Sequence, residues 1–559
     1  MSTPKKKKNM KPRSERYTLS NHVANFFLAA AFAIFPLFVN LTFDGNFPFI
    51  HFDNGFILIR HNKYYFFLIL TAAAVIMELL LLLTRTVGEK MEKNPDKRAK
   101  QKTVSVTDFA VLCFVMACAL STVFSAHLNM ALYGEIAVGG ATHGRNNGLI
   151  LMLCYAVVYL LLTRCWRFRE YVFLALAGSS VIVYLLAVLN AFYIDPLNMF
   201  AQFRNDENVF VNFMTTIGNK NMFSSHICVT LPVLMTMFVH TERLRNKVIY
   251  FAAACIGSMA AVVCDSDSVV LGMGAFAMVF LVAYARKPKR LRQFLLMLTA
   301  SLCSMKLLGV FSALGGDNHK EMGAVLYSVM QSNLTYAVIA VLAALTVGMY
   351  VLDRKHHRET LPLAVPIVLG AFFGTVVLAG VGVILYFSLI DTKTDLGSME
   401  RTLRFSDRWG THRGFMWNKA MEAYAQFDFP KKMFGTGPDT FYYTFSPYFA
   451  ELYERFDDGS TDAAHNEYIN YLLNIGAVGL LTYLAFVGSA LTRAFKAAKR
   501  NPLALVFASA VVAYLTQAVV NIALPIATPL FIIFVSLCEA TARSRVATPN
   551  PRNLRLIKA

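Results

Sequence analysis

The chain has 559 residues, of which 56% are hydrophobic and 16% are charged, and its mean hydropathy is +0.49. This composition is too apolar for an ordinary soluble domain and indicates a polytopic membrane protein. Basic loops in contact with anionic lipid account for the formal net charge of +19, so we expect no nucleic-acid partner. The nine cysteines form no C-x-x-C pair, which argues against a disulfide framework or a metal site.

Apolar windows long enough to cross a bilayer core of about 30 Å as helices recur along most of the chain. We therefore predict an all-α polytopic membrane protein with about 14 transmembrane helices and no fewer than 12. The windows lie at residues 23–43, 65–84, 107–125, 147–163, 171–192, 222–240, 248–264, 268–285, 292–312, 332–351, 362–390, 466–490, 502–521 and 526–541.

Lys and Arg are distributed unevenly between the two sets of loops that alternate along the chain. One set, together with both tails, holds 37 of the 53 Lys and Arg residues. Short cytoplasmic loops carry such an excess, so both termini are predicted to lie in the cytoplasm. Nine of the 16 remaining basic residues lie in one segment, 391–465, on the opposite side.

The long loop 391–465 is rich in aromatic residues and includes the run FYYTFSPYFAELYERF. A disordered linker would be poor in aromatic residues, so we expect this loop to fold against the membrane face. Side-chain periodicity predicts helices at about 414–426 and 439–455. The G-T-G-P run at 435–438 lacks the spacing of a phosphate-binding loop, and we interpret it as a turn that needs glycine.

Three polar clusters are expected to meet at the outer membrane face. Two are G-R-N-N-G at 144–148 and G-N-K-N at 218–221, and the third is the long loop with its arginines and His465. A phosphorylated substrate carried on a lipid needs fixed cations at headgroup depth, and arginine pairs with phosphate oxygens bidentately. The loop is therefore a candidate binding site for such a substrate.

Several of these residues also have a purely structural interpretation. Arginines at a membrane interface can reach lipid phosphates or pair with nearby carboxylates. Asn466 is a good cap for the helix that follows, whereas histidine is a poor one. We interpret His465 as a general base, because a neutral imidazole can take a proton from an attacking hydroxyl. Arg413 lies four residues before Trp417, on the same face of the predicted helix.

Four short motifs follow one another over 413–485. They are R-x3-W at 413–417, G-x-G at 435–437, A-H-N-x-Y-I at 464–469 and G-x2-G-L at 476–480. In this combination the chain resembles the O-antigen ligase and O-antigen polymerase superfamily of bacterial envelope enzymes. Weaker matches in the G-R-N-N-G and G-N-K-N segments extend the resemblance to about 145–485.

The resemblance implies a GT-C-like glycosyltransferase of the cytoplasmic membrane that assembles cell-surface polysaccharide. Such an enzyme moves a glycan from undecaprenyl diphosphate to an acceptor hydroxyl on the outer face, with inversion and without a cofactor or metal ion. His465 is then the base that activates the acceptor, and Arg413 holds the donor diphosphate. The implied partners are the undecaprenyl-diphosphate-linked glycan, a glycan, lipid or protein acceptor, and membrane lipids. The further candidate substrate-binding residues are Arg145, Lys220, Arg401, Arg404, Arg408, Trp417 and Asn466.

The predicted organisation follows from the windows and from this resemblance. It comprises a cytoplasmic basic tail at 1–22, helices 1 to 11 over 23–390, an extracytoplasmic catalytic loop at 391–465, helices 12 to 14 over 466–541 and a cytoplasmic tail at 542–559.

Two features depart from the family pattern. Many relatives carry Ser-Arg at the outer start of a middle helix, where the arginine is a second contact to the diphosphate, but this chain has Ser266-Asp267-Ser268. Either Arg145, Lys220 or an arginine of 401–408 makes this second contact in its place, or the protein uses a different donor. About 14 helices also exceed the usual twelve of the ligases, and we expect 286–361 to be the extra pair.

Other functions remain open at this stage. A polymerase of the same superfamily differs from a ligase only in its acceptor. A lipid-linked oligosaccharide flippase fits the helix count but should carry charged or broken helices along a central cavity. A peptidoglycan polymerase of the shape, elongation and division family would rely on an outer-loop aspartate, for which Asp457, Asp458 and Asp462 are the candidates. The fourth alternative is a non-catalytic scaffold.

Overall fold

The computed structural model describes residues 18–39, 55–91, 104–138, 141–199, 212–316, 319–356, 360–457 and 459–543. The predicted tails lie largely outside these residues. Within them, each of the predicted apolar windows coincides with a helix, and 11 helices are long and apolar enough to cross a membrane. The prediction of an all-α polytopic membrane protein is confirmed.

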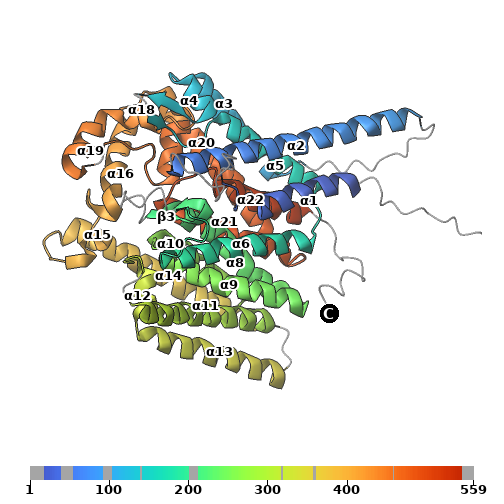
Figure 1. Ribbon diagram of the computed structural model, residues 1–559, viewed down its shortest axis with the longest axis vertical. Coiled ribbons are helices and arrows are strands. Elements are labelled where there is room, and N and C mark those ends of the chain that lie inside the picture. The colour runs from blue at the N-terminus through green and yellow to red at the C-terminus, as the bar shows by residue number, and fades with distance from the viewer. Residues whose placement is uncertain are drawn as a thin grey trace, which may run out of the picture.

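The helices that match the windows lie side by side, with α13 at one edge of the set (Figure 1). They are α1 (Thr18–Ala33), α2 (Gly55–Met91), α3 (Val106–Val123), α5 (Leu149–Cys165), α6 (Glu170–Ala191), α8 (Lys220–His240), α9 (Leu244–Val263), α10 (Asp267–Tyr284), α11 (Pro288–Gly315), α13 (Leu334–His356), α14 (Ala364–Leu385, continued by a π-helical turn at Tyr386–Ile390), α20 (Glu467–Ala497), α21 (Leu503–Gln517, continued by a 3-10 turn at Ala518–Val520) and α22 (Thr528–Arg543).

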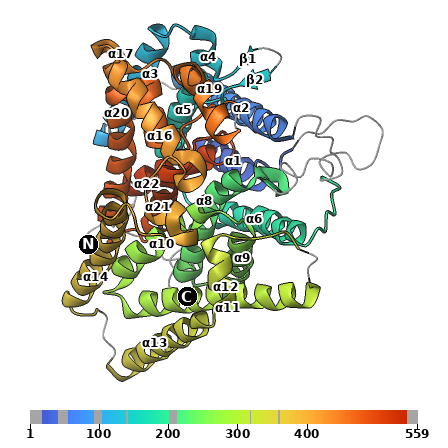
Figure 2. The same ribbon diagram turned by 90° about the vertical axis from the view of Figure 1, so that its left-hand side faces the viewer.

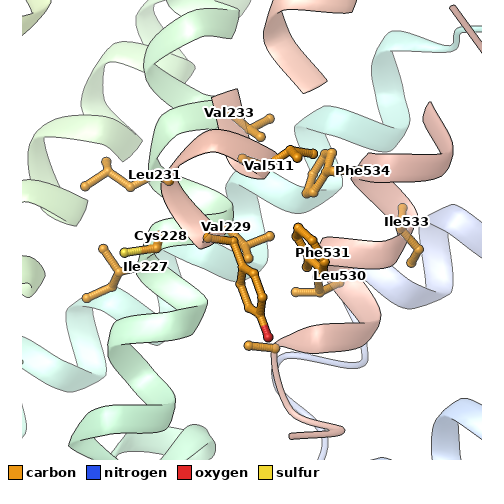
Figure 3. Packing of buried hydrophobic residues seen from close by; sticks show 14 of the residues in the cluster. Ile227, Cys228, Val229, Leu231, Val233, Val511, Leu530, Phe531, Ile533 and Phe534 are labelled. Atoms are coloured by element: carbon orange, nitrogen blue, oxygen red, sulfur yellow. The ribbon is translucent and has the colours of Figure 1, made fainter. Parts of the chain in front are cut away.

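The core forms where α8 meets α21 and α22. Most of α8 is buried, as expected of a helix that is apolar on all faces. Side chains of the three helices, among them Val229, Val511 and Phe531, gather at one place in the interior (Figure 3). Phe531 stacks on Tyr514 with ring centroids 4.1 Å apart. At the opposite extreme, the apolar window of α14 has no buried residue, which suits a helix that faces lipid.

Short elements cap one end of the helices. Helix α4 (Leu128–Tyr133) precedes an antiparallel hairpin of β1 (Ile136–Val138) and β2 (Ala141–His143). A second, smaller antiparallel pair joins β3 (Phe213–Met214) to β4 (Gly218–Asn219), with a 3-10 turn at Thr215–Ile217 between them. Helix α12 (Val325–Gln331) links α11 to α13.

The long loop folds at this same end, where α16 and α19 lie together (Figure 2). Its elements are a 3-10 turn at Gly397–Met399, α15 (Glu400–Leu403), α16 (Trp409–Gln426), α17 (Phe429–Phe434), α18 (Phe441–Phe445), a 3-10 turn at Ser446–Tyr448 and α19 (Phe449–Phe456). They share a small apolar core of Phe415, Met416, Ala420, Phe441, Phe445, Leu452, Ala464 and Leu473. The loop therefore has a fold of its own.

Two details of the loop differ from the predicted helices. The regular part of α16 matches the helix expected at 414–426, but the helix expected at 439–455 is divided into α18 and α19. Pro447 lies in the 3-10 turn between them, where its ring and missing N–H disfavour a continuous α-helix. Helix α17 was not predicted; Asp428 caps it through a hydrogen bond from the N–H of Lys431.

Helix α20 is bent at Gly476, whose φ of 69° and ψ of −177° are not helical. At about 1.5 Å per residue, its 31 residues are longer than a membrane core requires. The residues before Gly476 can therefore stand above the core, next to the folded loop.

Candidate functional site

His465 lies between the end of the long loop and the start of α20. Its φ of 50° is left-handed, a conformation that costs a non-glycine residue about 1 kcal/mol or more and therefore has to be imposed by neighbouring contacts. The side chain is partly exposed, but its Nδ1 is buried and has no hydrogen-bond partner among the described residues. An imidazole held in this way can still accept a proton or a hydrogen bond.

The main chain on either side of His465 is fixed by three side chains. Trp417 Nε1 donates a hydrogen bond of 2.9 Å to Ala464 O, and Ala464 N donates one of 2.8 Å to Asn470 Oδ1. Asn466 caps α20, because its Oδ1 accepts from the N–H groups of Tyr468 and Ile469. Trp417 and Asn466 were predicted to bind substrate, but their polar groups here hold the protein backbone.

Arg413 lies on α16, one turn before Trp417, and is close enough to His465 to lower the pKa of the imidazole. No hydrogen bond or ion pair holds its guanidinium within the described part of the chain. Burial lowers the pKa of Arg413, and the nearby Asp267 carboxylate opposes this effect. Asp267, at the position that the resemblance predicts for an arginine of many relatives, is thus close to the arginine of the R-x3-W motif.

Arg145 is the second cation near His465. Its position is set by Asp439, whose Oδ2 accepts hydrogen bonds from the backbone N–H groups of Arg145 at 2.6 Å and Asn147 at 2.9 Å. Arg145 Nε lies 3.8 Å from Asp462 Oδ2 and makes no hydrogen bond with the described residues. The G-R-N-N-G segment is thereby joined to the loop, and Asp462 partly balances the charge of its arginine.

The sequence analysis missed Asp439 and Arg60. Burial raises the pKa of Asp439 to about 7, against hydrogen bonds from the backbone that lower it. Arg60 of α2 is buried and donates to Asn146 Oδ1 at 2.9 Å and to Gly144 O at 2.6 Å. Arg60 precedes the apolar window and has no motif around it, so only the rarity of buried charge in a membrane protein could have drawn attention to it.

The G-x-G turn docks on the bend of α20. The N–H of Thr436 donates to Leu473 O at 3.1 Å and that of Gly437 to Asn474 O at 2.8 Å. Gly435 has a φ of 76°, and a Cβ there would lie 2.3 Å from Asn474 O. The interpretation of this run as a turn that needs glycine is confirmed. The bend at Gly476 gives these carbonyl groups partners outside the helix.

Lys220 stands at the start of α8, with its Nζ 3.6 Å from Asp265 Oδ2. Asp265 also accepts hydrogen bonds from the N–H groups of Gly323 and Ala324, and Asp267 accepts one from Val325 N. The carboxylates before and at the start of α10 thus bind the segment that leads into α12. Lys220 belongs to this cluster, and its positive charge is partly balanced there.

Arg401, Arg404 and Arg408, the other predicted binding residues of the loop, differ in what they contact. The guanidinium of Arg404 contacts Glu400 at 2.5 Å and the carbonyl oxygens of Phe387, Asp391 and Thr394 at 3.0, 3.1 and 2.7 Å. It therefore joins the loop to the end of the preceding membrane helix. Arg401 and Arg408 instead line a separate cleft, and neither is among the charges that perturb His465.

Comparison with known proteins was informative for one part of the chain. Residues 322–484 match the O-Antigen ligase family, Wzy_C, whereas no curated protein gives a significant match. The matched region includes residues 322–361, so this part of the predicted extra pair lies inside the family domain. It also covers α16, the G-x-G turn and His465. Residues 322–484 are thus similar to an O-antigen ligase domain, and they lie in a chain whose described residues include 11 helices long and apolar enough to cross a membrane.

Proposed function

We propose that the protein is a glycosyltransferase that moves a glycan from undecaprenyl diphosphate to an acceptor hydroxyl, as an O-antigen ligase does. The observation that carries this proposal is the neighbourhood of His465. His465 has a left-handed backbone conformation, and its imidazole Nδ1 has no hydrogen-bond partner among the described residues. Two arginines, Arg413 and Arg145, are close enough to act on its charge. This arrangement joins a proton acceptor to two cations that can bind a diphosphate.

In the proposed reaction the acceptor oxygen attacks the anomeric carbon of the donor, and the bond from that carbon to the diphosphate oxygen breaks. The acceptor proton passes to His465, which later releases it to water. Arg413 and Arg145 neutralise the charge that develops on the departing diphosphate. Direct displacement of this kind inverts the anomeric carbon.

The resting charge state of His465 supports the role of a proton acceptor. Burial, followed by the positive charges of Arg413 and Arg145, lowers the pKa of His465 to about 3, so the imidazole is neutral at pH 7. A diphosphate bound to the two arginines would offset their charge and raise this pKa. The base would then become stronger when the donor is present.

Arg145 is our candidate for the second diphosphate contact, in place of the arginine that Asp267 replaces. Its charge is one of the two that lower the pKa of His465, whereas neither Lys220 nor Arg404 acts on His465 in this way. The ammonium group of lysine cannot form the bidentate contact that a guanidinium group makes with phosphate oxygens. Both Arg413→Lys and Arg145→Lys should therefore impair transfer.

The decisive experiment compares His465→Ala, Arg413→Ala and Arg413→Lys in the host cell, with Lys431→Gln, on the loop surface, as the control. We expect the three site variants to be made at normal levels, to lose surface glycan and to accumulate the lipid-linked donor. If His465→Ala and Arg413→Ala leave both quantities unchanged, the proposed function is wrong. The length of the transferred glycan separates a ligase from a polymerase, because a polymerase variant accumulates single repeat units.

We further propose that the protein lies in the cytoplasmic membrane of a bacterium, with both termini in the cytoplasm and the loop 391–465 outside. A membrane-impermeant thiol reagent should label a cysteine placed at Ser446 and spare one placed at Lys97. The parent chain, with its nine cysteines, gives the background. The opposite labelling pattern would also overturn the proposed site, because the donor glycan would lie on the other side.

A further inference from the structure

A cleft of about 640 Å³ opens on the loop between α16 and α19, which lie together in Figure 2. Its walls include Arg401, Arg408, His412, Tyr453 and Phe456. A hollow of about 500 Å³ adjoins it and shares Arg401 and Arg408, so both guanidinium groups stand between the two spaces. Together these hollows are large enough for several sugar rings.

Arg401 and Arg408 have no charged partner in the part of the chain that the structure describes. Both are exposed, and neither takes part in an ion pair or a side-chain hydrogen bond there. The nearby Arg455 differs, because Asp407 holds it at 2.7 Å and Glu451 at 3.2 Å. Two unpaired guanidinium groups at the edge of a cleft are suited to bind carboxylate or phosphate oxygens.

The other walls of the cleft suit a saccharide. His412 packs against Phe456 with ring centroids 4.1 Å apart and a tilt of 36° between the rings, which gives one wall an aromatic surface on which a sugar ring can lie. Glu454 and Asp457 add carboxylate oxygens that can accept hydrogen bonds from sugar hydroxyls. They also limit the positive charge of the cleft, which therefore fits a sugar with one or two anionic groups better than a polyanion.

The cleft adjoins the proposed reaction site through the chain itself. Thr411 and His412 of the wall have left-handed φ values of 61° and 65°, and the next residue is Arg413. The wall of the cleft is therefore contiguous in the chain with the residue that is proposed to hold the donor diphosphate.

We propose that this cleft is a saccharide subsite that binds an anionic sugar, one that carries a carboxylate or a phosphate, of the glycan that the protein handles. The proposal rests on the proposed function for its biological meaning but not for its test. Binding to the cleft needs neither His465 nor a lipid-linked donor.

The test measures binding to the purified full-length chain in detergent. The probes are trigalacturonate, its methyl ester and maltotriose phosphate, and the variant is Arg401→Gln/Arg408→Gln. The control is Lys393→Gln/Lys431→Gln, which removes the same charge from two exposed loop positions outside the cleft. We expect the arginine variant to bind one or both anionic probes about tenfold more weakly, the size of a lost charged contact, and the control to bind them normally.

Three outcomes decide the matter. The proposal is supported if anionic binding falls only in the arginine variant, if the methyl ester does not distinguish that variant from the parent, and if His465→Ala binds normally. It is overturned if the parent binds neither anionic probe more tightly than the arginine variant does. It is also overturned if the lysine control loses as much affinity, because general surface charge would then explain binding.

The source of the anionic sugar is found by assaying transfer with the arginine variant. An increase of KM for the acceptor, with little change of kcat, assigns the cleft to the acceptor glycan. An increase of KM for the lipid-linked donor assigns it to the donor glycan. If normal probe binding by His465→Ala is accompanied by normal transfer, the proposed function fails while the subsite stands.

Discussion

Trp417 of α16 donates its indole N–H to the carbonyl oxygen of Ala464 over 2.9 Å, and so joins the helix of Arg413 to the residue before His465. The two residues proposed to act together lie about fifty positions apart in sequence. Their relative position therefore depends on this bond and on the small apolar core of the loop.

Trp417→Phe keeps a large aromatic ring and removes only the donor. We expect kcat to fall about fivefold to tenfold with little change in KM for the donor, because a hydrogen bond of this kind contributes about 1 kcal/mol and its loss loosens His465. Steady-state transfer measures both constants. Trp409→Phe is the matched control, since it loses an equivalent 3.0 Å bond to Thr402 O at the start of the loop. Equal losses in the two variants would show that the bond to Ala464 has no special role.

Asn466 can be tested as a helix cap against its earlier interpretation as a substrate ligand. Asn466→Ala should lower the free energy of unfolding by about 1 kcal/mol, and Asn466→Ser should restore most of it, because serine caps helices well. If the residue acts only as a cap, activity should follow stability in both variants. Transfer that stays low in a fully stable Asn466→Ser would instead indicate direct contact with substrate.

Gly476→Ala tests the bend of α20. The added Cβ would lie 2.3 Å from the carbonyl carbon of Met433, at a φ of 69° that alanine rarely adopts. We expect a loss of about 2 kcal/mol or more of stability, visible as a lower Tm in scanning fluorimetry. Gly488→Ala, in the same helix and with no heavy atom within 4 Å of its Cβ, should leave Tm unchanged or slightly higher. A similar Tm for both variants would mean that α20 tolerates a side chain at the bend.

Asp439→Asn should change how stability depends on pH. Burial raises the pKa of Asp439 from 3.8 to about 7 in the folded protein. The folded state therefore binds this proton more tightly than the unfolded state does. The resulting contribution to stability is complete below about pH 4 and is lost as the pH rises through 7.

Melting curves between pH 5 and pH 8 measure this effect. The Tm of the parent should fall more steeply with pH than that of Asp439→Asn, whose side chain does not titrate. Asp457→Asn, at an exposed position, should behave as the parent does. Parallel curves for the parent and Asp439→Asn would contradict the assignment of the titration to Asp439.

The membrane helices could be predicted from sequence because apolar length alone decides whether a segment can cross a bilayer. The same holds for the G-x-G turn, where glycine is required by local backbone geometry. The division of the second loop helix could also have been predicted from the sequence, because Pro447 lies inside the segment that was predicted to be one helix.

The partners of the site could not be predicted in this way, because they come from segments far apart in sequence. Nothing near Asp439 shows that its carboxylate binds the backbone of Arg145, almost 300 residues away. For the same reason the loop arginines were treated as one group. Their separation into the tether Arg404 and the cleft residues Arg401 and Arg408 follows only from tertiary contacts.

The bend at Gly476 also indicates where the loop should be joined in a chimaera that exchanges it with the loop of a related protein. The first turns of α20 bind the G-x-G turn through Leu473 and Asn474, so they belong to the loop rather than to the span below. A chimaera joined at 465 would separate these partners and present a foreign turn to the wrong carbonyl groups. A transplant that begins near 391 and ends just after Gly476 would keep the G-x-G turn together with the carbonyl groups of α20 that hold it.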